Sequence, residues 1–249
     1  MVLKRWEDLP EKIKNEDVKR YYDILSKKRI SLVIKRIFDL VLAIILLIIL
    51  SPLFIIIAIA IKIDSKGPVM FRQTRVTQYG KKFRIFKFRT MITDAEKIGS
   101  QVTTKNDTRI TRIGRVLRKY RLDEIPQLLN IIAGEMSFVG TRPEVPKYVE
   151  RYTDEMLATL LLPAGVTSEA SIQYKDEELL LTNASDIDEV YINRVLSGKM
   201  KYNLKSMEYF SLLNDIKTMF KTVIVFVQKK ERANRAIART ETNKSEVRM

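Results

Sequence analysis

An uncharged run of 22 residues, LVLAIILLIILSPLFIIIAIAI, occupies positions 40–61 and constrains the fold more than any other feature of the chain. As a straight helix it would be ~33 Å long, which is about the thickness of the hydrocarbon core of a bilayer. It is also longer than the apolar core of a cleaved signal peptide. The sequence therefore predicts a membrane protein that keeps this segment.

Ser51 and Pro52 interrupt the run at its centre. Proline cannot donate to the carbonyl of Ile48 and its ring clashes there, at a cost of ~3 kcal/mol or more, although the Ser51 hydroxyl can satisfy the freed carbonyl. Basic residues flank both ends of the run, so the positive-inside rule selects no orientation. Two arrangements stay open: a single kinked span, and a helix-break-helix hairpin that enters and leaves one leaflet.

The composition narrows the chemistry. The chain has no histidine and no cysteine, which excludes imidazole bases, thiolate nucleophiles, zinc sites built from these residues, and disulfides. Catalysis must then use carboxylate, amine, hydroxyl or metal. A net charge of +15 indicates an anionic partner, and nucleic acid, an acidic membrane surface and phosphorylated substrates all qualify.

Two adjacent carboxylates, Asp123 and Glu124, follow the most basic stretch of the chain. The arginines of that stretch recur every three residues, at Arg109, Arg112, Arg115, Arg118 and Arg121. Guanidinium groups favour ionised carboxylates and bind phosphate oxygens, so the pattern indicates phosphate chemistry. The alternative is that Asp123 and Glu124 only complement the dipole of a helix starting near Pro126.

Spacing around the preceding helix limits which arginines can reach the acid pair. Steps of three residues rotate ~60° backward around a helix, so these arginines cannot share one site. We expect Arg118, or else Arg115 or Arg121, to meet the acid pair. Arg109 and Arg112 are expected to face lipid headgroups or solvent. Asp107 or Thr108 is expected to cap this helix, whose apolar stripe is Ile110, Ile113 and Leu117.

Two other segments have clear periodicity. Residues 68–91 alternate apolar and polar side chains around Tyr79-Gly80-Lys81, which predicts a β-hairpin. Residues 203–226 follow helical spacing, with lysines beside the apolar positions Leu204, Met207, Phe210, Leu213, Ile216, Phe220, Ile224 and Val227. That helix can lie on the leaflet or pack in the core, and the spacing does not choose.

Three motifs, in order, carry a family resemblance. They are KRIFDLVLAIILLIILSPLFIIIAIAIKIDSKGPVMFRQTRV, FKFRTM and NDTRITRIGRVLRKYRLDEIPQLLNIIAGEMSFVGTRPE, which run from Lys35 to Glu144, with weaker similarity to Thr222. They resemble the bacterial sugar transferases of the small monotopic phosphoglycosyl transferase superfamily. The resemblance implies transfer of a sugar 1-phosphate from a nucleotide diphosphate sugar, usually a UDP-sugar, to polyprenyl phosphate such as undecaprenyl phosphate. The expected products are polyprenyl-diphosphate-sugar and UMP, at the start of surface glycan assembly.

The resemblance also implies residue roles. Asp123 matches the nucleophile that forms an aspartyl-phosphosugar intermediate, and Glu124 matches its partner, which assists with the metal or the acceptor. Mg²⁺ is the implied ion, with Asp123 and Glu124 as its ligands. Lys87, Arg118 and Arg142 match phosphate-binding positions. Ser51 and Pro52 match the helix-breaking pair, which favours the re-entrant hairpin.

The expected architecture is a helix-rich α+β monotopic membrane protein with a re-entrant helix-break-helix, a small β-hairpin region and amphipathic interfacial helices. The expected divisions are an N-terminal extension (1–30), the membrane hairpin (31–66), a catalytic domain (67–228) and a basic, disordered tail (229–249). The catalytic domain would face the cytoplasm at the bacterial inner membrane. Expected partners are the nucleotide sugar, polyprenyl phosphate and the membrane, with no nucleic acid; a homodimer is left open.

Thr141, where the family usually has proline, and the segment GVTSEAS after Ala164 depart from the pattern and leave the sugar undetermined. Two other protein classes compete with a transferase. A non-enzymatic membrane adaptor for acidic lipids or polyanions explains the charge but not the acid pair. A nucleic-acid-binding protein explains the arginines, but the basic stretch lacks aromatic residues interleaved for base stacking.

Overall fold

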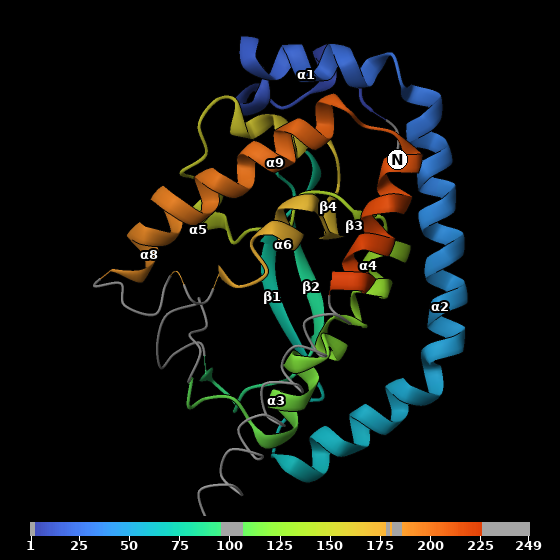
Figure 1. Ribbon diagram of the computed structural model, residues 1–249, viewed down its shortest axis with the longest axis vertical. Helices are drawn as coiled ribbons and strands as arrows, with labels where there is room; N and C mark the ends of the chain where they lie inside the picture. Colours follow the sequence, from blue (N-terminus) through green and yellow to red (C-terminus); the bar gives the residue numbers. More distant parts are fainter. Residues whose placement is uncertain (1–2, 96–106, 178–179, 181–185, 226–249) are drawn as a thin grey trace, which may run out of the picture.

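Helices dominate the part of the chain that the structure describes, and two small two-stranded sheets lie among them (Figure 1). The computed structural model describes residues 3–95, 107–177, 180 and 186–225. The arrangement of helices and sheets confirms the helix-rich α+β part of the predicted architecture, while the re-entrant membrane arrangement stays a prediction. The predicted tail, 229–249, lies outside the described residues.

The apolar run forms most of helix α2, Arg29–Asp64, a helix of 36 residues with Pro52 in its interior. Figure 1 shows the helix bending partway along its length, so that its two halves point in different directions. The Ser51 hydroxyl donates to the carbonyl oxygen of Ile48 at 2.8 Å, which confirms the predicted compensation for the missing proline amide. Among the described helices, α2 is the one long and apolar enough to cross a membrane.

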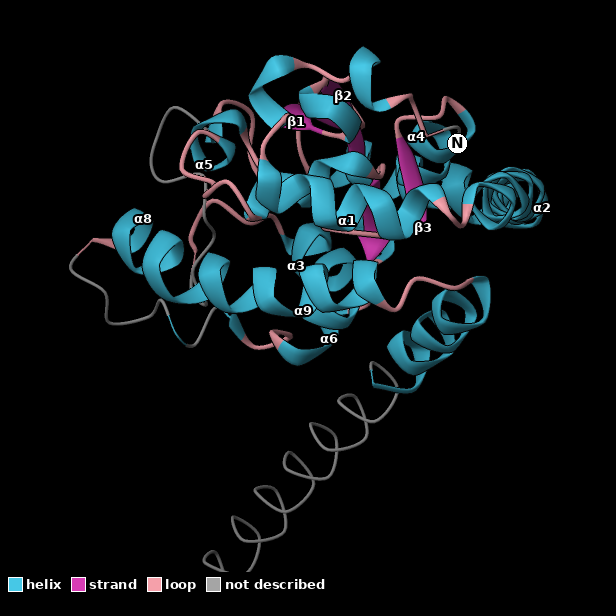
Figure 2. Cartoon of the chain, turned by 90° about the horizontal axis from the view of Figure 1, so that it is seen from above, coloured by secondary structure: helices cyan, strands magenta, loops and turns pink. Residues whose placement is uncertain are grey.

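The two faces of α2 differ. Its inner face packs on the rest of the protein, and its outer face leaves large apolar side chains exposed. The buried positions are Leu32, Lys35, Asp39, Ala43, Ile57 and Ile61; the exposed ones include Ile34, Ile37, Val41, Ile44, Ile48, Ile49, Ile55, Ile56 and Ile59. Seen from above, the remaining elements lie to one side of the half of this helix that precedes the bend (Figure 2). An exposed apolar surface of this length indicates contact with lipid.

The predicted hairpin is present. Strand β1, Met70–Val76, pairs antiparallel with β2, Lys82–Phe88, and the short 3-10 helix η3, Gln78–Gly80, joins them. Helix α4, Gln127–Ile132, lies against β2 through Asn130. The Asn130 side chain accepts from the Phe86 amide at 2.8 Å and donates to the Arg84 carbonyl at 3.1 Å. This side chain extends the hydrogen bonding of β2 to α4.

A second sheet, which the sequence did not predict, pairs β3, Met136–Val139, in parallel with β4, Ala164–Thr167. Its end depends on a close approach of two glycine backbones. A Cβ on Gly165 would lie 2.2 Å from the Gly140 nitrogen. No other residue fits there without moving the strands apart.

The N-terminal residues form part of the main core. The 3-10 helices η1, Trp6–Asp8, and η2, Glu11–Ile13, precede helix α1, Glu16–Ser26. Their apolar side chains pack with Val76, Tyr79 and residues of η6, Met156–Leu161, and α9, Ser197–Glu208. Residues that precede and follow α2 in the chain therefore share one hydrophobic core.

Helix α3, Arg112–Lys119, begins later than the sequence suggested. Its N-cap is Thr111, whose hydroxyl accepts from the Gly114 amide at 3.0 Å, so the expected cap at Asp107 or Thr108 is wrong. Asp107 instead accepts from the Arg109 side chain at 2.6 Å. The expectation that Arg109 faces lipid or solvent is also wrong, because this ion pair satisfies its guanidinium.

The segment expected as one helix over 203–226 divides into two. The short helices α5, Pro146–Val149, α6, Glu169–Gln173, and α8, Ile187–Val190, and the π-helical η7, Tyr191–Leu196, precede α9. Leu204 and Met207 of α9 are buried in the core. After Phe210, residues 212–225 form a further helix that exposes Leu213, Phe220, Val223 and Ile224. Core packing is thus confirmed for Leu204 and Met207. Contact of the exposed residues with a leaflet stays a prediction, and Val227 lies outside the described residues.

Candidate active site

The acid pair lies on a tight turn between two helices. Asp123 and Glu124 belong to the 3-10 helix η5, Leu122–Glu124, between α3 and α4. Arg121, just before the turn, has a φ of 55°, a left-handed conformation that is uncommon for arginine. Leu122 and Ile125 pack beside Phe88 and Leu117 in a small core cluster and hold the turn from both sides.

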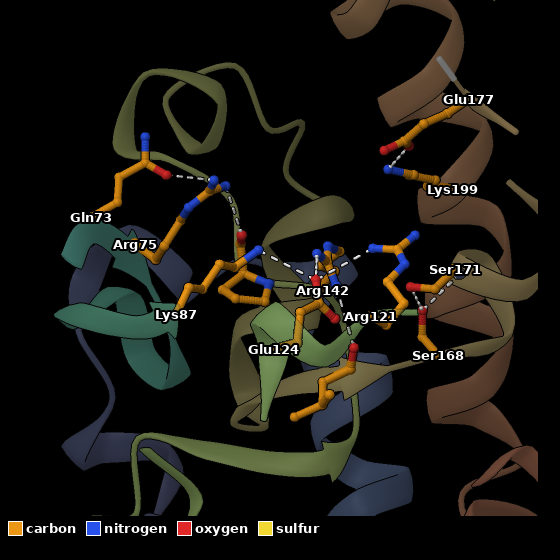
Figure 3. Close-up of polar contacts among 12 residues, drawn as sticks. Gln73, Arg75, Lys87, Arg121, Glu124, Arg142, Ser168, Ser171, Glu177 and Lys199 are labelled. Carbon is orange, nitrogen blue, oxygen red and sulfur yellow. Dashed lines mark hydrogen bonds and ion pairs between the residues drawn. The ribbon is translucent and has the colours of Figure 1, made fainter. Parts of the chain in front are cut away.

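Three cations surround Glu124. Lys87 Nζ and Arg121 Nη1 each lie 3.3 Å from Glu124 Oε1, and Arg142 makes a closer ion pair with the same oxygen (Figure 3). Burial alone would raise the pKa of the Glu124 carboxyl, but the charges of Arg142, Lys87 and Arg121 outweigh it and hold the pKa well below its usual value. Glu124 is therefore ionised at neutral pH.

Asp123 has a different environment on the same turn. The residue is buried, and among the described residues no hydrogen-bond partner is recorded for its Oδ1. Burial raises the pKa of Asp123 above its usual value, and the neighbouring charge of Glu124 adds to the shift. The expectation that guanidinium groups favour the ionised carboxyls is met most strongly at Glu124. At Asp123 the charges of Lys87, Arg121 and Arg118 also lower the pKa, but burial and the Glu124 charge outweigh them. The two carboxyl groups thus have opposite shifts, as is common in catalytic pairs.

Two of the three cations are positioned by the sheets: Lys87 lies on β2, and Arg142 lies shortly after β3. Lys87 points to the same side of β2 as the buried Phe83 and Ile85, because alternate residues of a strand share a face. Burial lowers the pKa of Lys87 to about 8, even though Glu124 favours its charged form. Arg142 follows β3, and its guanidinium also donates to the Val166 carbonyl of β4 at 3.4 Å. The unpredicted sheet therefore positions Arg142.

Of the arginines of α3 and the turn, Arg121 contacts the acid pair. Arg118 is half-buried on α3, and its charge favours the ionised form of Asp123. Within the described residues no ion pair joins Arg118 to either carboxylate. Helical spacing favours Arg118 and leaves Arg121 only as an alternative, because periodicity does not show that the chain turns at Arg121.

A cleft of about 290 Å³ adjoins the turn. Part of its wall is polar and charged, with Arg121, Glu124, Arg142, Ser171, Tyr174, Glu177 and Lys199. Another part is apolar, with Leu46, Leu50, Ile125, Leu128, Phe138 and Val166. Thr167 and Thr222 complete the lining, and their hydroxyl groups lie 2.8 Å apart. The cleft can thus hold a ligand with both anionic and apolar parts.

The acid pair is the candidate site for a metal. The described residues contain no group of three or more aspartate, glutamate, histidine or cysteine side chains that could hold an ion. Mg²⁺, however, commonly takes one or two protein carboxylates and completes its shell with phosphate oxygens and water. The unpartnered oxygen of Asp123 fits that pattern, and Glu124 is adjacent.

Curated proteins similar to this chain share one chemistry in their names. The chain is 35% identical over 193 residues to the UDP-N-acetylgalactosamine-undecaprenyl-phosphate N-acetylgalactosaminephosphotransferase of Aeromonas hydrophila, covering 76% of this chain and 43% of the relative. It is 35% identical over 195 residues to the UDP-glucose:undecaprenyl-phosphate glucose-1-phosphate transferase of Escherichia coli, covering 76% of this chain and 39% of the relative. It is 34% identical over 217 residues to the undecaprenyl-phosphate galactose phosphotransferase of Salmonella typhimurium, covering 81% and 42%.

The similarity covers most of this chain but less than half the length of each of these relatives. The family described as bacterial sugar transferase matches residues 30–229, which include all of α2 except its first residue, both sheets and the acid pair. The chain therefore belongs to the bacterial sugar transferase family.

Proposed function

We propose that the protein transfers a sugar 1-phosphate from a UDP-sugar to undecaprenyl phosphate, giving undecaprenyl-diphosphate-sugar and UMP. The observation that carries the proposal is the acid pair: a buried Asp123 without a recorded partner for Oδ1, beside a Glu124 held by three cations. Simple helix capping needs no such arrangement. Family membership and the names of the relatives support the same reaction.

Each proposed chemical step breaks one phosphorus–oxygen bond and forms another. A carboxylate oxygen of Asp123 attacks the phosphorus that carries the sugar, and the bond to the phosphate of UMP breaks. An oxygen of undecaprenyl phosphate then attacks the same phosphorus, and the bond to Asp123 breaks, which restores the carboxylate. A carboxylate suits this role because it needs no base to activate it.

Lys87, Arg121 and Arg142 would bind the phosphate oxygens of the donor. Each now pairs with Glu124, so the diphosphate would share or replace those contacts. Because all three cations converge on one carboxylate, they converge beside Asp123 as well. Arg118 would add positive potential from α3.

We propose Asp123 and Glu124 as the ligands of Mg²⁺. Bound there with the diphosphate oxygens, the ion would neutralise the negative charge that develops on the departing phosphate. Without a counter-charge, two carboxylates and a diphosphate would repel one another. Repulsion of this kind already acts within the protein. Burial disfavours the ionised form of Asp123 most, and the Glu124 charge raises the pKa of Asp123 further.

The apolar wall of the cleft supports a lipid acceptor. Leu46 and Leu50 belong to α2, whose outer face exposes its isoleucines. An isoprenoid chain leaving a phosphate near Arg142 could follow these leucines towards the bilayer. A soluble donor and a lipid acceptor can meet only at the membrane surface.

We also propose that α2 enters and leaves one leaflet, with both ends on the cytoplasmic face. The shared core supports this arrangement. The Lys4 amide, before α2, donates to the Tyr79 hydroxyl, after α2, at 2.9 Å, and apolar residues from both sides pack together. A helix that crossed the bilayer would place these partners on opposite sides. The exposed apolar residues of helix 212–225 could then rest on the same leaflet.

The test is release of UMP from UDP-sugars by detergent-solubilised protein with undecaprenyl phosphate and Mg²⁺. We expect lipid-dependent release in the wild type and a loss of at least ~10³-fold in Asp123→Asn, because the amide is a poor nucleophile. Glu124→Gln tests the partner, and Lys81→Met is the control on the exposed hairpin turn. Equal activity in Asp123→Asn would reject Asp123 as the nucleophile. Silence of well-folded protein across a broad panel of UDP-sugars would point to another nucleotide sugar first and to a membrane adaptor second.

A further inference from the structure

A second ion pair lines the cleft and has no part in the chemistry proposed above. Lys199, at the start of α9, pairs with Glu177, which follows α6 (Figure 3). The Lys199 side chain is only 7% exposed, whereas the Glu177 side chain is 33% exposed. Lysine is almost never buried to this extent unless it is paired, and Glu177 is its partner here.

The local fold holds this lysine in place. Lys199 Nζ lies 5.4 Å from the ring centre of Tyr191, the first residue of the π-helical η7. Gly198 packs against Tyr174, because a Cβ on Gly198 would lie 1.8 Å from the Tyr174 hydroxyl oxygen. Tyr174 itself lines the cleft. Irregular helical turns such as η7 occur frequently at functional sites.

The chemistry of this part of the cleft differs from that around Glu124. Glu177 offsets the charge of Lys199, so the pair is near neutral and fits a phosphate poorly. Ser171 and Tyr174 add hydroxyl groups beside it. A carboxylate that accepts, an ammonium that donates and nearby hydroxyls together suit a neutral ring whose own hydroxyl groups both donate and accept.

We propose that Glu177 and Lys199 recognise the hydroxyl groups of the sugar that is transferred, and thereby select the sugar. This inference rests on the proposed function. The sugar is bonded to the phosphorus that Asp123 attacks, so it must lie beside the acid pair. Arg121 and Arg142 take the phosphates and the apolar wall takes the lipid, which leaves the Glu177–Lys199 wall for the carbohydrate.

The ribose of the nucleotide has similar hydroxyl groups, so the experiment must separate it from the transferred sugar. UMP contains the ribose and lacks the sugar. We would measure kcat/KM for the best UDP-sugar and for its epimers, and inhibition by UMP, in the wild type, Glu177→Gln and Lys199→Met. The matched control is Lys147→Met, which removes the exposed ion pair with Asp188 at 2.7 Å, outside the cleft.

We expect both cleft variants to lose ~10-fold or more in kcat/KM for the best UDP-sugar. The ratio of kcat/KM between that UDP-sugar and its epimers should also fall, since a site built to bind a hydroxyl discriminates strongly. Inhibition by UMP should stay within about twofold, as expected when the contact is to the sugar alone. A parallel loss of UMP inhibition, or an unchanged preference among sugars, would overturn the proposal. Absence of lipid-dependent UMP release in the wild type would instead reject the proposed function, and unchanged thermal melting would exclude misfolding.

Discussion

At the scale of single residues, Lys87 links burial to the pH at which the protein should work. Burial lowers its pKa to about 8, so the ammonium loses its proton as the pH rises through that value. A neutral amine binds a diphosphate weakly. We therefore expect kcat/KM for the donor to fall above a pH of about 8 in the free enzyme.

Lys87→Arg tests this assignment, because a guanidinium keeps its charge well above that pH. The falling limb of the pH profile should move to higher pH in this variant, even if its maximum rate is lower. Lys81→Arg on the hairpin turn should leave the profile unchanged. If the limb stays at the same pH in Lys87→Arg, another group controls it.

The sequence predicted the site residues unevenly. Asp123 and Glu124 stand out because they follow a basic stretch, but only the family resemblance singled out Lys87 and Arg142, which look like an ordinary strand lysine and a loop cation. The contact between Arg121 and Glu124 depends on a left-handed residue, which periodicity does not reveal. The raised pKa of Asp123 depends on burial, which comes from packing of the whole turn.

At the scale of elements, a buried polar cluster joins α2 to helix 212–225 and to β3. Lys35 of α2 lies 2.6 Å from Asp215 and 3.7 Å from Asp39, and Asp39 accepts from the Ser137 hydroxyl at 2.7 Å. Lys35 and Asp39 are almost completely buried. A sequence pattern shows Lys35 and Asp39 only as charges next to an apolar run, since their partners are far away in the chain.

Removal of Lys35 should destabilise this junction. Lys35→Met leaves the carboxylates of Asp39 and Asp215 buried without their cation, and breaking a buried pair in this way typically costs about 3 to 5 kcal/mol. We expect a lower thermal midpoint in detergent. Lys14→Met removes the pair with the exposed Glu11 and should cost about 0 to 1 kcal/mol. Equal midpoints for the two variants would show that the cluster is not a stabilising junction.

The two sheets show what local sequence can predict. The hairpin β1–β2 was predictable because alternation and a turn lie within one short segment. The parallel pairing of β3 and β4 was not, because each strand has four residues and their register depends on the contact between Gly140 and Gly165. The same limit applies to α9 and helix 212–225. The apolar spacing is the same in both, but apolar residues of α9 such as Leu204 are buried in the core, and those of helix 212–225 such as Leu213 are exposed.

At the scale of the whole molecule, two energetic costs decide how α2 sits in the membrane: the loss of the shared core if α2 spans the bilayer, and the bending of α2 if it does not. A span would separate residues 3–28 from residues that follow α2, and the core that contains Leu25 and Tyr79 would be lost. Burial of apolar side chains contributes roughly 1.5 to 3 kcal/mol for each large residue, so losing the core would be far more costly than bending one helix. This comparison of energies supports the hairpin in one leaflet that we propose.

The absence of cysteine from the chain makes this arrangement directly testable. Lys12→Cys and Lys81→Cys place single thiols at exposed positions before and after α2, and Ser51→Cys places one at the bend. In whole cells, a membrane-impermeant maleimide should label neither Lys12→Cys nor Lys81→Cys until the inner membrane is opened, and then both. Ser51→Cys should resist the reagent in either state, since the bend would lie in lipid. Labelling of only one of the two flanking thiols in intact cells would mean that α2 crosses the bilayer, and the shared core could then not form in the membrane.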